Sequence, residues 1–342
     1  MAPQEAASSP KINAEISELQ ANALKGDVAA QVKLGKAYMY GDGLSKNDEL
    51  AAKWFRKAAD QGDASAEDQL GNMYRSGVGV ARDKEEAVRW YMEASRHGSA
   101  TGMFNLGTCF YNGDGVGSNE YTAYLWFLLA QDAGEPAAED AVKRSGSTMS
   151  NSDTAEEFVR ISNMYYKGEE LPKDDAQSLR WLRRAAEINS RAKVLLAVRL
   201  LSAPQPEHHY SEVLDLCKAA ARDDATGQRC VGHMYRHGWG VNRDPAEAIK
   251  WYKMAVSGNN VLAAFELGEM YASGEGRKVD RPEAFMMFLE AAQHGVKGAR
   301  EKALALYQQM DKADIKKTNG KLTERRLDPK KVVTSLQKVP TS

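Results

Sequence analysis

The sequence has few cysteines, almost no net charge and no long hydrophobic run. Cys109, Cys217 and Cys230 are too few and too widely spaced for a zinc site or a disulfide framework, which would show closely spaced pairs. The 46 basic and 47 acidic residues leave a formal net charge of -1, which gives no global attraction to nucleic acid or to an anionic membrane. Because no run of about 18 apolar residues occurs, we expect no transmembrane segment. These absences predict a soluble chain that binds no nucleic acid.

The N-terminus also lacks the basic and apolar regions of a signal peptide. We therefore expect a cytoplasmic protein if the chain is full length. The segment Ala2-Pro-Gln-Glu-Ala6 would equally suit the start of a mature exported protein, for which we expect the bacterial periplasm or the outside of the cell. The sequence leaves this choice, the organism and the oligomeric state open.

An internal repeat is the dominant feature of the sequence. An apolar residue, a small residue and, three places later, an aromatic or large apolar residue recur at intervals of 35 or 36 residues, with one longer interval after Gly107. The small residues are Gly35, Gly71, Gly107, Ser162, Ala197, Gly232 and Gly268, and Leu304 with Tyr307 begins an eighth repeat. Nineteen places after them stand Trp54, Trp90, Trp126, Trp181, Leu216, Trp251 and Met287. This spacing predicts amphipathic helices, and we expect the five tryptophans to lie in the core.

Helix starts and stops also occur at fixed places in the repeat. Twelve places after the small residue stand the N-cap residues Asn47, Asp83, Asn119, Asp174, Asp244 and Asp280, with His209 as the exception. Eight places after the Trp position stand Gly62, Gly98, Gly134, Asn189, Asp224, Asn259 and Gly295, which tolerate the left-handed conformation that ends a helix. Glycine pairs such as Gly41 and Gly43 permit a turn that reverses the chain. The predicted fold is all-α, a solenoid of antiparallel helix pairs.

A known family shares this pattern. The segment Leu70 to Gly98 reads Leu-Gly-x-x-Tyr, Gly-x-Gly-Val, Asp, Ala-x-x-Trp-x-x-x-Ala, Gly, and it resembles the Sel1-like repeat family of the tetratricopeptide-like helical repeats. The resemblance covers roughly residues 20 to 310 and implies a right-handed α-solenoid, or superhelix, of about seven repeats of 35–36 residues plus capping helices. It also implies a protein-binding scaffold or adaptor that is not an enzyme. The alternative is a bacterial envelope or cell-wall-related ligand-binding protein.

Irregular segments divide the chain into blocks. We expect an N-terminal block at 10–145, a linker at 146–152, a C-terminal block at 153–312 and a tail at 313–342. The first block would hold a cap helix, three repeats and a short capping helix, and the second would hold four repeats and a cap helix. Asp153 with Glu156 predicts a capping box at the start of the second block. The tail has a surplus of Lys and Arg and few apolar residues, so we expect it to be basic and flexible.

Chemical motifs are outweighed by structural interpretations. The loop Gly113–Gly117 follows a predicted helix rather than a strand, so it is a repeat turn and not a phosphate loop. His233 and His237 lie one helical turn apart, but the His-Glu-x-x-His pattern of a zinc helix is absent. We therefore expect no catalytic residue, no cofactor and no metal site.

The cysteines are expected to be buried rather than reactive. Cys109 occupies a core position that methionine fills in other repeats. Cys217 and Cys230 lie symmetrically about the turn at Asp224, so a bridge between them remains open beside two buried thiols.

A row of polar residues marks the candidate binding face. The residue after each small landmark is mostly polar where a core position would be apolar, at Lys36, Asn72, Thr108, Asn163, Val198, His233 and Glu269. One turn further on stand Arg75, Tyr111, Tyr166, Arg236 and His237, of types that often dominate interface energies. Trp239, between two glycines, either joins this face or packs on the neighbouring loop. We predict that these residues bind a protein or peptide on a concave face formed by the first helix of each repeat.

Overall fold

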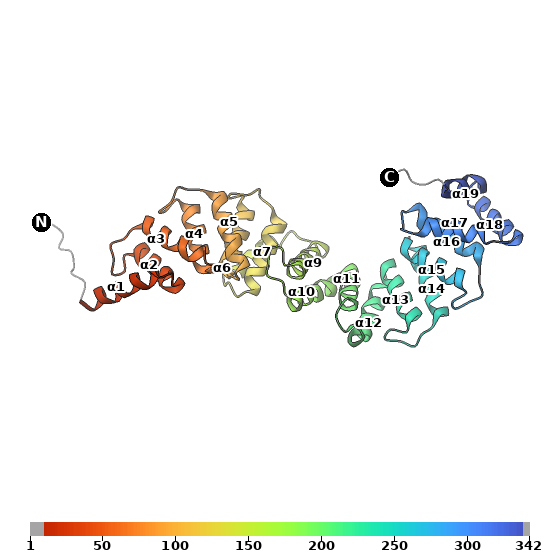
Figure 1. The fold of residues 1–342 in the computed structure, drawn as a ribbon, viewed down its shortest axis with the longest axis horizontal. Helices are drawn as coiled ribbons and strands as arrows, with labels where there is room; N and C mark the ends of the chain where they lie inside the picture. The colour runs from red at the N-terminus through yellow and green to blue at the C-terminus, as the bar shows by residue number, and fades with distance from the viewer. Residues whose placement is uncertain (1–9, 338–342) are drawn as a thin grey trace. The chain divides into compact units, whose positions relative to one another are not determined.

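The structure, a computed structural model, describes residues 10–337, and every regular element in that range is helical (Figure 1). Most contacts join helices that are neighbours along the chain. The predicted all-α stack of helix pairs is therefore confirmed. The helices form two compact units that divide between Trp181 and Leu182. None of the helices between residues 10 and 337 is long and apolar enough to cross a bilayer.

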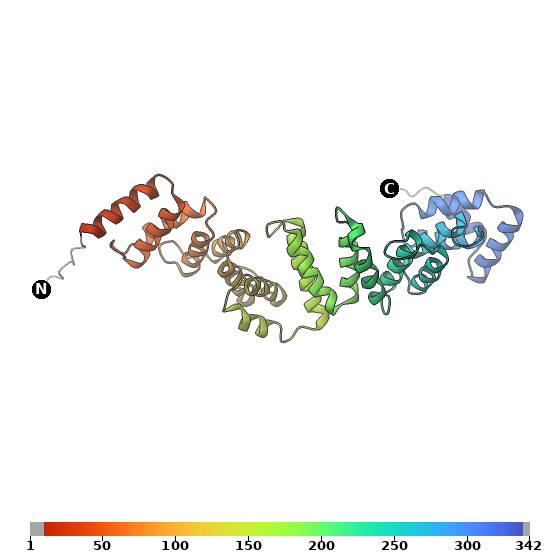
Figure 2. The same ribbon diagram turned by 90° about the horizontal axis from the view of Figure 1, so that it is seen from below.

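The first unit contains a leading helix, three complete helix pairs and an extra helix before the fourth pair. Its elements are α1 (Pro10–Leu24), α2 (Val28–Tyr40), α3 (Asp48–Ala59), α4 (Ala64–Ser76), α5 (Lys84–Arg96), α6 (Ala100–Asn112), α7 (Glu120–Asp132), α8 (Ala138–Ser145) and α9 (Asn151–Lys167). The next helix, α10 (Asp175–Ile188), crosses the division. Paired helices such as α2 and α3 lie side by side in both views (Figures 1 and 2).

The second unit contains the remaining pairs and three terminal helices. Its elements are α11 (Ser190–Leu201), the short 3-10 helix η1 (Pro206–His209), α12 (Tyr210–Ala220), α13 (Ala225–His237), α14 (Pro245–Ser257), α15 (Val261–Ser273), α16 (Arg281–Gln293), α17 (Ala299–Gln308), α18 (Lys312–Glu324) and α19 (Pro329–Gln337). The first helices of the repeats are thus α2, α4, α6, α9, α11, α13 and α15, each followed by its second helix.

The predicted N-caps are confirmed. The side-chain oxygens of Asn47, Asp83, Asn119, Asp174, Asp244 and Asp280 each accept a hydrogen bond from the backbone N–H three residues further on. His209 makes no side-chain cap, as its residue type predicts.

At two of the predicted helix stops the expected left-handed conformation is wrong. Gly62, Gly98, Gly134, Asn259 and Gly295 have the positive φ of a left-handed residue. Asn189 and Asp224 instead have φ of -132° and -124°, and their side chains cap the starts of α11 and α13. The repeats at these two positions are one residue shorter than the others. One residue must therefore both follow the preceding helix and cap the next, which requires an extended backbone.

The two glycines of each loop meet different requirements. Gly77 ends α4 with φ 78° and donates its N–H to the carbonyl of Met73. Gly79 has φ 71°, and a Cβ atom there would overlap the backbone of Asp48 at the start of α3. Gly115, Gly240 and Gly276 lie in the same way on the first residues of α5, α12 and α14. Each of these loops therefore packs directly on the second helix of the preceding pair.

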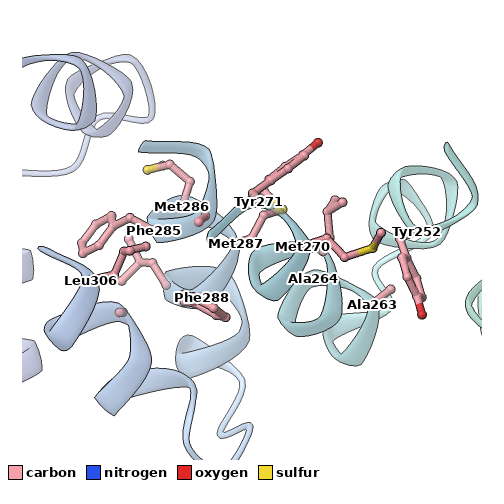
Figure 3. Close-up of a cluster of buried hydrophobic side chains, with 14 of the residues drawn as sticks. Tyr252, Ala263, Ala264, Met270, Tyr271, Phe285, Met286, Met287, Phe288 and Leu306 are labelled. Atoms are coloured by element: carbon pink, nitrogen blue, oxygen red, sulfur yellow. The ribbon is translucent and has the colours of Figure 1, made fainter. Parts of the chain in front are cut away.

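In most pairs the core is built from an aromatic ring seated on the small landmark. The Phe55 side chain is fully buried, and its ring atoms lie 2.9 Å from where a Cβ of Gly35 would stand. The same arrangement joins Tyr91 to Gly71, Phe127 to Gly107, Tyr252 to Gly232 and Phe288 to Gly268. In the second unit one cluster of these buried side chains extends from Tyr252 of α14 to Leu306 of α17 (Figure 3).

Four of the five tryptophans precede these rings by one residue, Trp181 precedes Leu182, and only some of the five are buried. The core prediction is confirmed for Trp126 and Trp181 and is wrong for Trp54, Trp90 and Trp251, which are partly exposed. Successive residues point about 100° apart on a helix, so adjacent positions cannot both face the landmark glycine. The exposed faces carry cations instead, since the Lys57 ammonium lies 4.2 Å from the Trp54 ring centroid and the Arg56 guanidinium 4.7 Å from that of Trp90.

The predicted capping box at Asp153 and Glu156 is also wrong. Helix α9 begins at Asn151, and its capping box joins Ser150 and Asp153. The Ser150 hydroxyl accepts the Asp153 N–H at 3.2 Å, and the Asp153 carboxylate accepts the Ser150 N–H at 2.9 Å. Asp153 is therefore the third helical residue rather than the cap. Whether the segment 146–152 acts as a linker or hinge remains a prediction.

The predicted flexible tail is helical over most of its length. Residues 313–337 lie in α18 and α19, and Leu322, Val332 and Leu336 join the apolar cluster of α16 and α17. Apolar residues spaced along the two short helices provide the buried face, which the average composition of the segment obscured. Residues 338–342 lie outside the described range.

The three cysteines differ in state. Cys217 of α12 and Cys230 of α13 form a disulfide with Cα atoms 5.6 Å apart, so of the two open alternatives the bridge is present. Cys109 is a buried free thiol, as predicted, and burial raises its pKa to about 11. Its thiol is therefore protonated and unreactive near neutral pH.

Candidate protein-binding face

The predicted binding residues lie on the first helices of the repeats, apart from Trp239 in the loop after α13. The exposed members are Lys36, Tyr111, Tyr166 and His237, and the partly buried members are Asn72, Arg75, Thr108, Asn163, His233, Arg236, Trp239 and Glu269. Val198 on α11 is also exposed. The partly buried side chains lie next to the buried landmark, which explains why several of them contact their own repeat.

On α4, Asn72 is engaged by the core. Its side-chain oxygen accepts a hydrogen bond from the Tyr91 hydroxyl at 2.9 Å and one from the Arg75 guanidinium at 3.3 Å. Arg75 lies 5.8 Å from the centroid of the Tyr91 ring. Asn72 therefore fixes the aromatic residue that fills the landmark glycine, a structural role that its position in the sequence did not reveal.

Charged members of the row in the second unit form ion pairs between successive repeats. Arg236 lies 3.0 Å from Glu275 and 3.5 Å from Glu269, with a side chain only 17% exposed. Arg243 contacts Glu275 at 2.7 Å, and Lys302 of α17 pairs with Glu269. Arg236 is partly buried between two carboxylates, each of which also has a second cationic partner, so these side chains form one ion-pair network across the repeats. Arg236 thus contributes to the cohesion of the stack.

Trp239 packs against aromatic neighbours, and its membership of the binding face remains a prediction. Its ring stacks on Tyr210 with centroids 5.3 Å apart and on His237 at 5.0 Å, and it meets the edge of His233 at 5.1 Å. The loop after α13 is therefore held on the start of α12. In the part of the chain that the structure describes, no group of three or more His, Cys, Asp or Glu residues is placed to hold a metal ion.

His233 should make the second unit sensitive to acid. Burial lowers the pKa of His233 to about 4; His237, Arg229 and Arg236 act in the same direction, and Glu266 opposes them. An unfolded histidine has a pKa of about 6.5, so between about pH 6.5 and pH 4 the unfolded state binds more protons than the folded state. Stability should therefore fall as the pH drops through this window.

We expect His233→Gln to reduce this acid-dependent loss, because glutamine does not titrate. Melting temperatures measured at pH 7 and pH 5 would test it, with wild type losing more than the variant. An equal loss in both proteins would assign the acid sensitivity to other groups.

A cavity of about 290 Å³ opens on the same face of the first unit. It is lined by Phe104, Thr108, Tyr111 and Asn112 of α6, Phe127 of α7, and Ala141 and Arg144 of α8. Thr108 and Tyr111 were predicted from the repeat pattern, whereas the others were missed. The signal for Ala141 and Arg144 is weak because α8 lies outside the repeat and has no fixed register, whereas Phe104, Asn112 and Phe127 lie on repeat helices.

A second hollow lies on the second-helix side of the first repeats. It is wider, at about 1320 Å³, and is lined by α3 residues including Lys53, Trp54 and Lys57 and by the loop Gly77–Ala81. None of the predicted binding residues contributes to it.

Comparison with known proteins shows that the chain matches a family of repeat proteins. The pattern of the Sel1 repeat matches residues 28–63, 64–99, 100–135, 159–190, 227–260 and 261–296. The unmatched stretches include α8 and the fifth repeat, where η1 replaces the glycine loop. A Sel1-like repeat-containing protein of Acanthamoeba polyphaga mimivirus is 28% identical over 86 residues, which make up 25% of this chain and 15% of that protein.

The chain also resembles solved structures of Sel1-like repeat proteins. A protective antigen of uropathogenic Escherichia coli with an SLR fold has 22% identity and a TM-score of 0.46, over 95% of this chain and 74% of its own. A Sel1 repeat protein of Oxalobacter formigenes has 22% identity and a TM-score of 0.34, over 82% of this chain and 93% of its own.

Proposed function

The chain belongs to the Sel1 repeat family, and from this premise we propose that it is a scaffold that binds a partner protein or peptide on the face formed by its first helices. Sel1 repeat proteins are generally protein-interaction scaffolds. The observation that supports the location is a contrast within the repeat. The landmark glycines and the rings seated on them are nearly uniform, whereas the next residue varies among Lys36, Thr108, Val198 and Glu269. Ion pairs within the chain engage Glu269, whereas Lys36 and Val198 are exposed, and a partner that contacts each repeat differently would account for the variation at these exposed positions.

Exposure divides the row into two functional groups. Arg236 and Trp239 hold neighbouring repeats together, and Asn72 fixes Tyr91 within its own repeat, through the contacts described above. Lys36, Tyr111 and Val198 leave their side chains available to a partner, with Tyr111 45% and Val198 54% exposed. We therefore assign partner binding to the exposed residues, and the partly buried residues hold the helices that carry them in place.

Substitution of the exposed group tests this proposal. Once a partner has been identified by crosslinking, Lys36→Ala together with Val198→Ala should weaken its binding by about 1–2 kcal/mol while the melting temperature stays nearly constant. Calorimetric titration would measure the change. The matched control is Arg89→Ala with Lys253→Ala, which changes exposed residues of the second helices. Loss of binding in the control pair alone would move the site to the second-helix side.

A further inference from the structure

The cavity between α6, α7 and α8 has a specific chemical character. Its floor is aromatic, because the Phe127 ring seated on Gly107 lies 5.5 Å from the Phe104 centroid and 6.4 Å from the Tyr111 centroid. Phe127 is almost fully buried and Tyr111 is 45% exposed, so the rings run from the core to the surface. An apolar side chain placed there would be removed from water on several sides.

The extra helix α8 creates this space. With eight residues α8 is about 12 Å long, whereas the thirteen residues of α6 extend about 20 Å. The buried residues of α8 are also small, namely Ala138, Ala141 and Ser145. A short helix with small side chains cannot cover the whole of α6 and α7, and it leaves the aromatic floor open.

Arg144 supplies the charge at this site. It is the one charged residue among those that line the cavity, and it is exposed. Its Nε atom donates only a long hydrogen bond, 3.4 Å, to the Asp140 carbonyl, and no ion pair joins it to a carboxylate within residues 14–337. The neighbouring Lys143, in contrast, is paired with Glu139 at 2.7 Å. Arg144 therefore has a guanidinium available for an anion from outside the chain.

We propose that this cavity binds the C-terminal apolar residue of a partner protein, with its side chain on Phe104, Tyr111 and Phe127 and its carboxylate on Arg144. A C-terminal residue carries a fixed negative charge directly beside its side chain, so one residue satisfies both the apolar floor and the cation. A guanidinium is suited to a carboxylate because it can donate two parallel hydrogen bonds. The Asn112 amide at the same cavity adds a further polar group. This inference rests on the proposed function and names the part of the partner that the first unit recognises.

Matched peptides test the proposal on the full chain. The probe is acetyl-Gly-Ser-Gly-Ser-Phe with a free C-terminal carboxylate, titrated to millimolar concentration and followed by NMR. Its C-terminal amide is the first comparison, and an amidated peptide with an internal Phe-Asp pair is the second. We expect the free acid to bind about tenfold more tightly than the amide, because a hydrogen bond to a charged group is stronger than one to a neutral group.

Variants assign the effect to the cavity. Arg144→Gln should abolish the preference for the free acid, whereas Lys143→Gln removes the same charge from the same helix and should preserve it. Equal binding of acid and amide, or no binding of either, would overturn the proposal. Equal loss in the two variants would reduce it to a general charge effect, and stronger binding of the Phe-Asp peptide would replace a C-terminus with an internal acidic segment. The partner test with Lys36 and Val198 is independent, so failure here leaves that result standing.

Discussion

Replacing Phe55 with alanine should lower the free energy of unfolding of the first unit by about 3–5 kcal/mol. Phe55 has no exposed surface, and its ring fills the space above Gly35. Removal of the ring therefore leaves a cavity between α2 and α3 that neither helix can close without moving. The adjacent Trp54→Ala change should cost only about 1–2 kcal/mol, since part of that ring is already in water. Guanidinium unfolding followed by circular dichroism would measure both values.

A reverse substitution supplies the control for this result. Gly35→Ala places a methyl group 2.9 Å from the Phe55 ring, so it should destabilise the unit even though alanine favours a helix by about 1 kcal/mol. Phe55→Leu should partly relieve the clash in the double variant. If Trp54→Ala proved more costly than Phe55→Ala, the assignment of the core to the second aromatic position would be wrong.

Reduction of the Cys217–Cys230 disulfide should destabilise the second unit by about 3 kcal/mol. The two residues are 13 apart in sequence, and the bridge limits the freedom of the unfolded segment between α12 and α13. Cys217 lies in the second helix of the fifth repeat, which lacks the glycine loop and a side-chain N-cap, so the bridge to α13 adds a covalent link where the repeat is irregular. Thermal unfolding with and without a reductant would show the loss.

The matching control uses the third cysteine. Cys217→Ser with Cys230→Ser should make the melting temperature insensitive to the reductant, whereas Cys109→Ala should retain the full response because its thiol is unpaired. If the double serine variant still responded to the reductant, the response would not be caused by this disulfide.

The repeat pattern predicted the fold well because each boundary depends on local chemistry. A side chain such as Asn47 caps a helix through a backbone group three residues away, so its effect can be seen in the sequence. The choice between Trp54 and Phe55 depends on the direction of a neighbouring helix, which sequence spacing does not specify. Helix α8 was predicted as a short capping helix, whereas α18 and α19 were missed, since each of them occurs once and has no repeat to confirm its register.

The candidate face was predicted only in outline. The repeat pattern located its row of residues, because a residue that is polar in most repeats directly after the landmark indicates a position that turns away from the core. It did not distinguish residues such as Asn72, whose side chain is hydrogen-bonded within the chain, from residues such as Lys36, whose side chain faces solvent. Arg144 was beyond reach, because its significance arises from the space that a short helix leaves open.

The glycine that rests on the preceding helix determines where this protein can be cut. Gly79 belongs to the second repeat, but it packs on the start of α3 and so covers part of the backbone of the first repeat. A fragment that stops after α3 would leave that backbone exposed, whereas one that continues through the loop at Gly79 would keep it covered. Fragments and grafted repeats should therefore begin at the first helix of one repeat and end after the glycine loop of the following repeat. This end point lies beyond the end of the repeat that the sequence period defines.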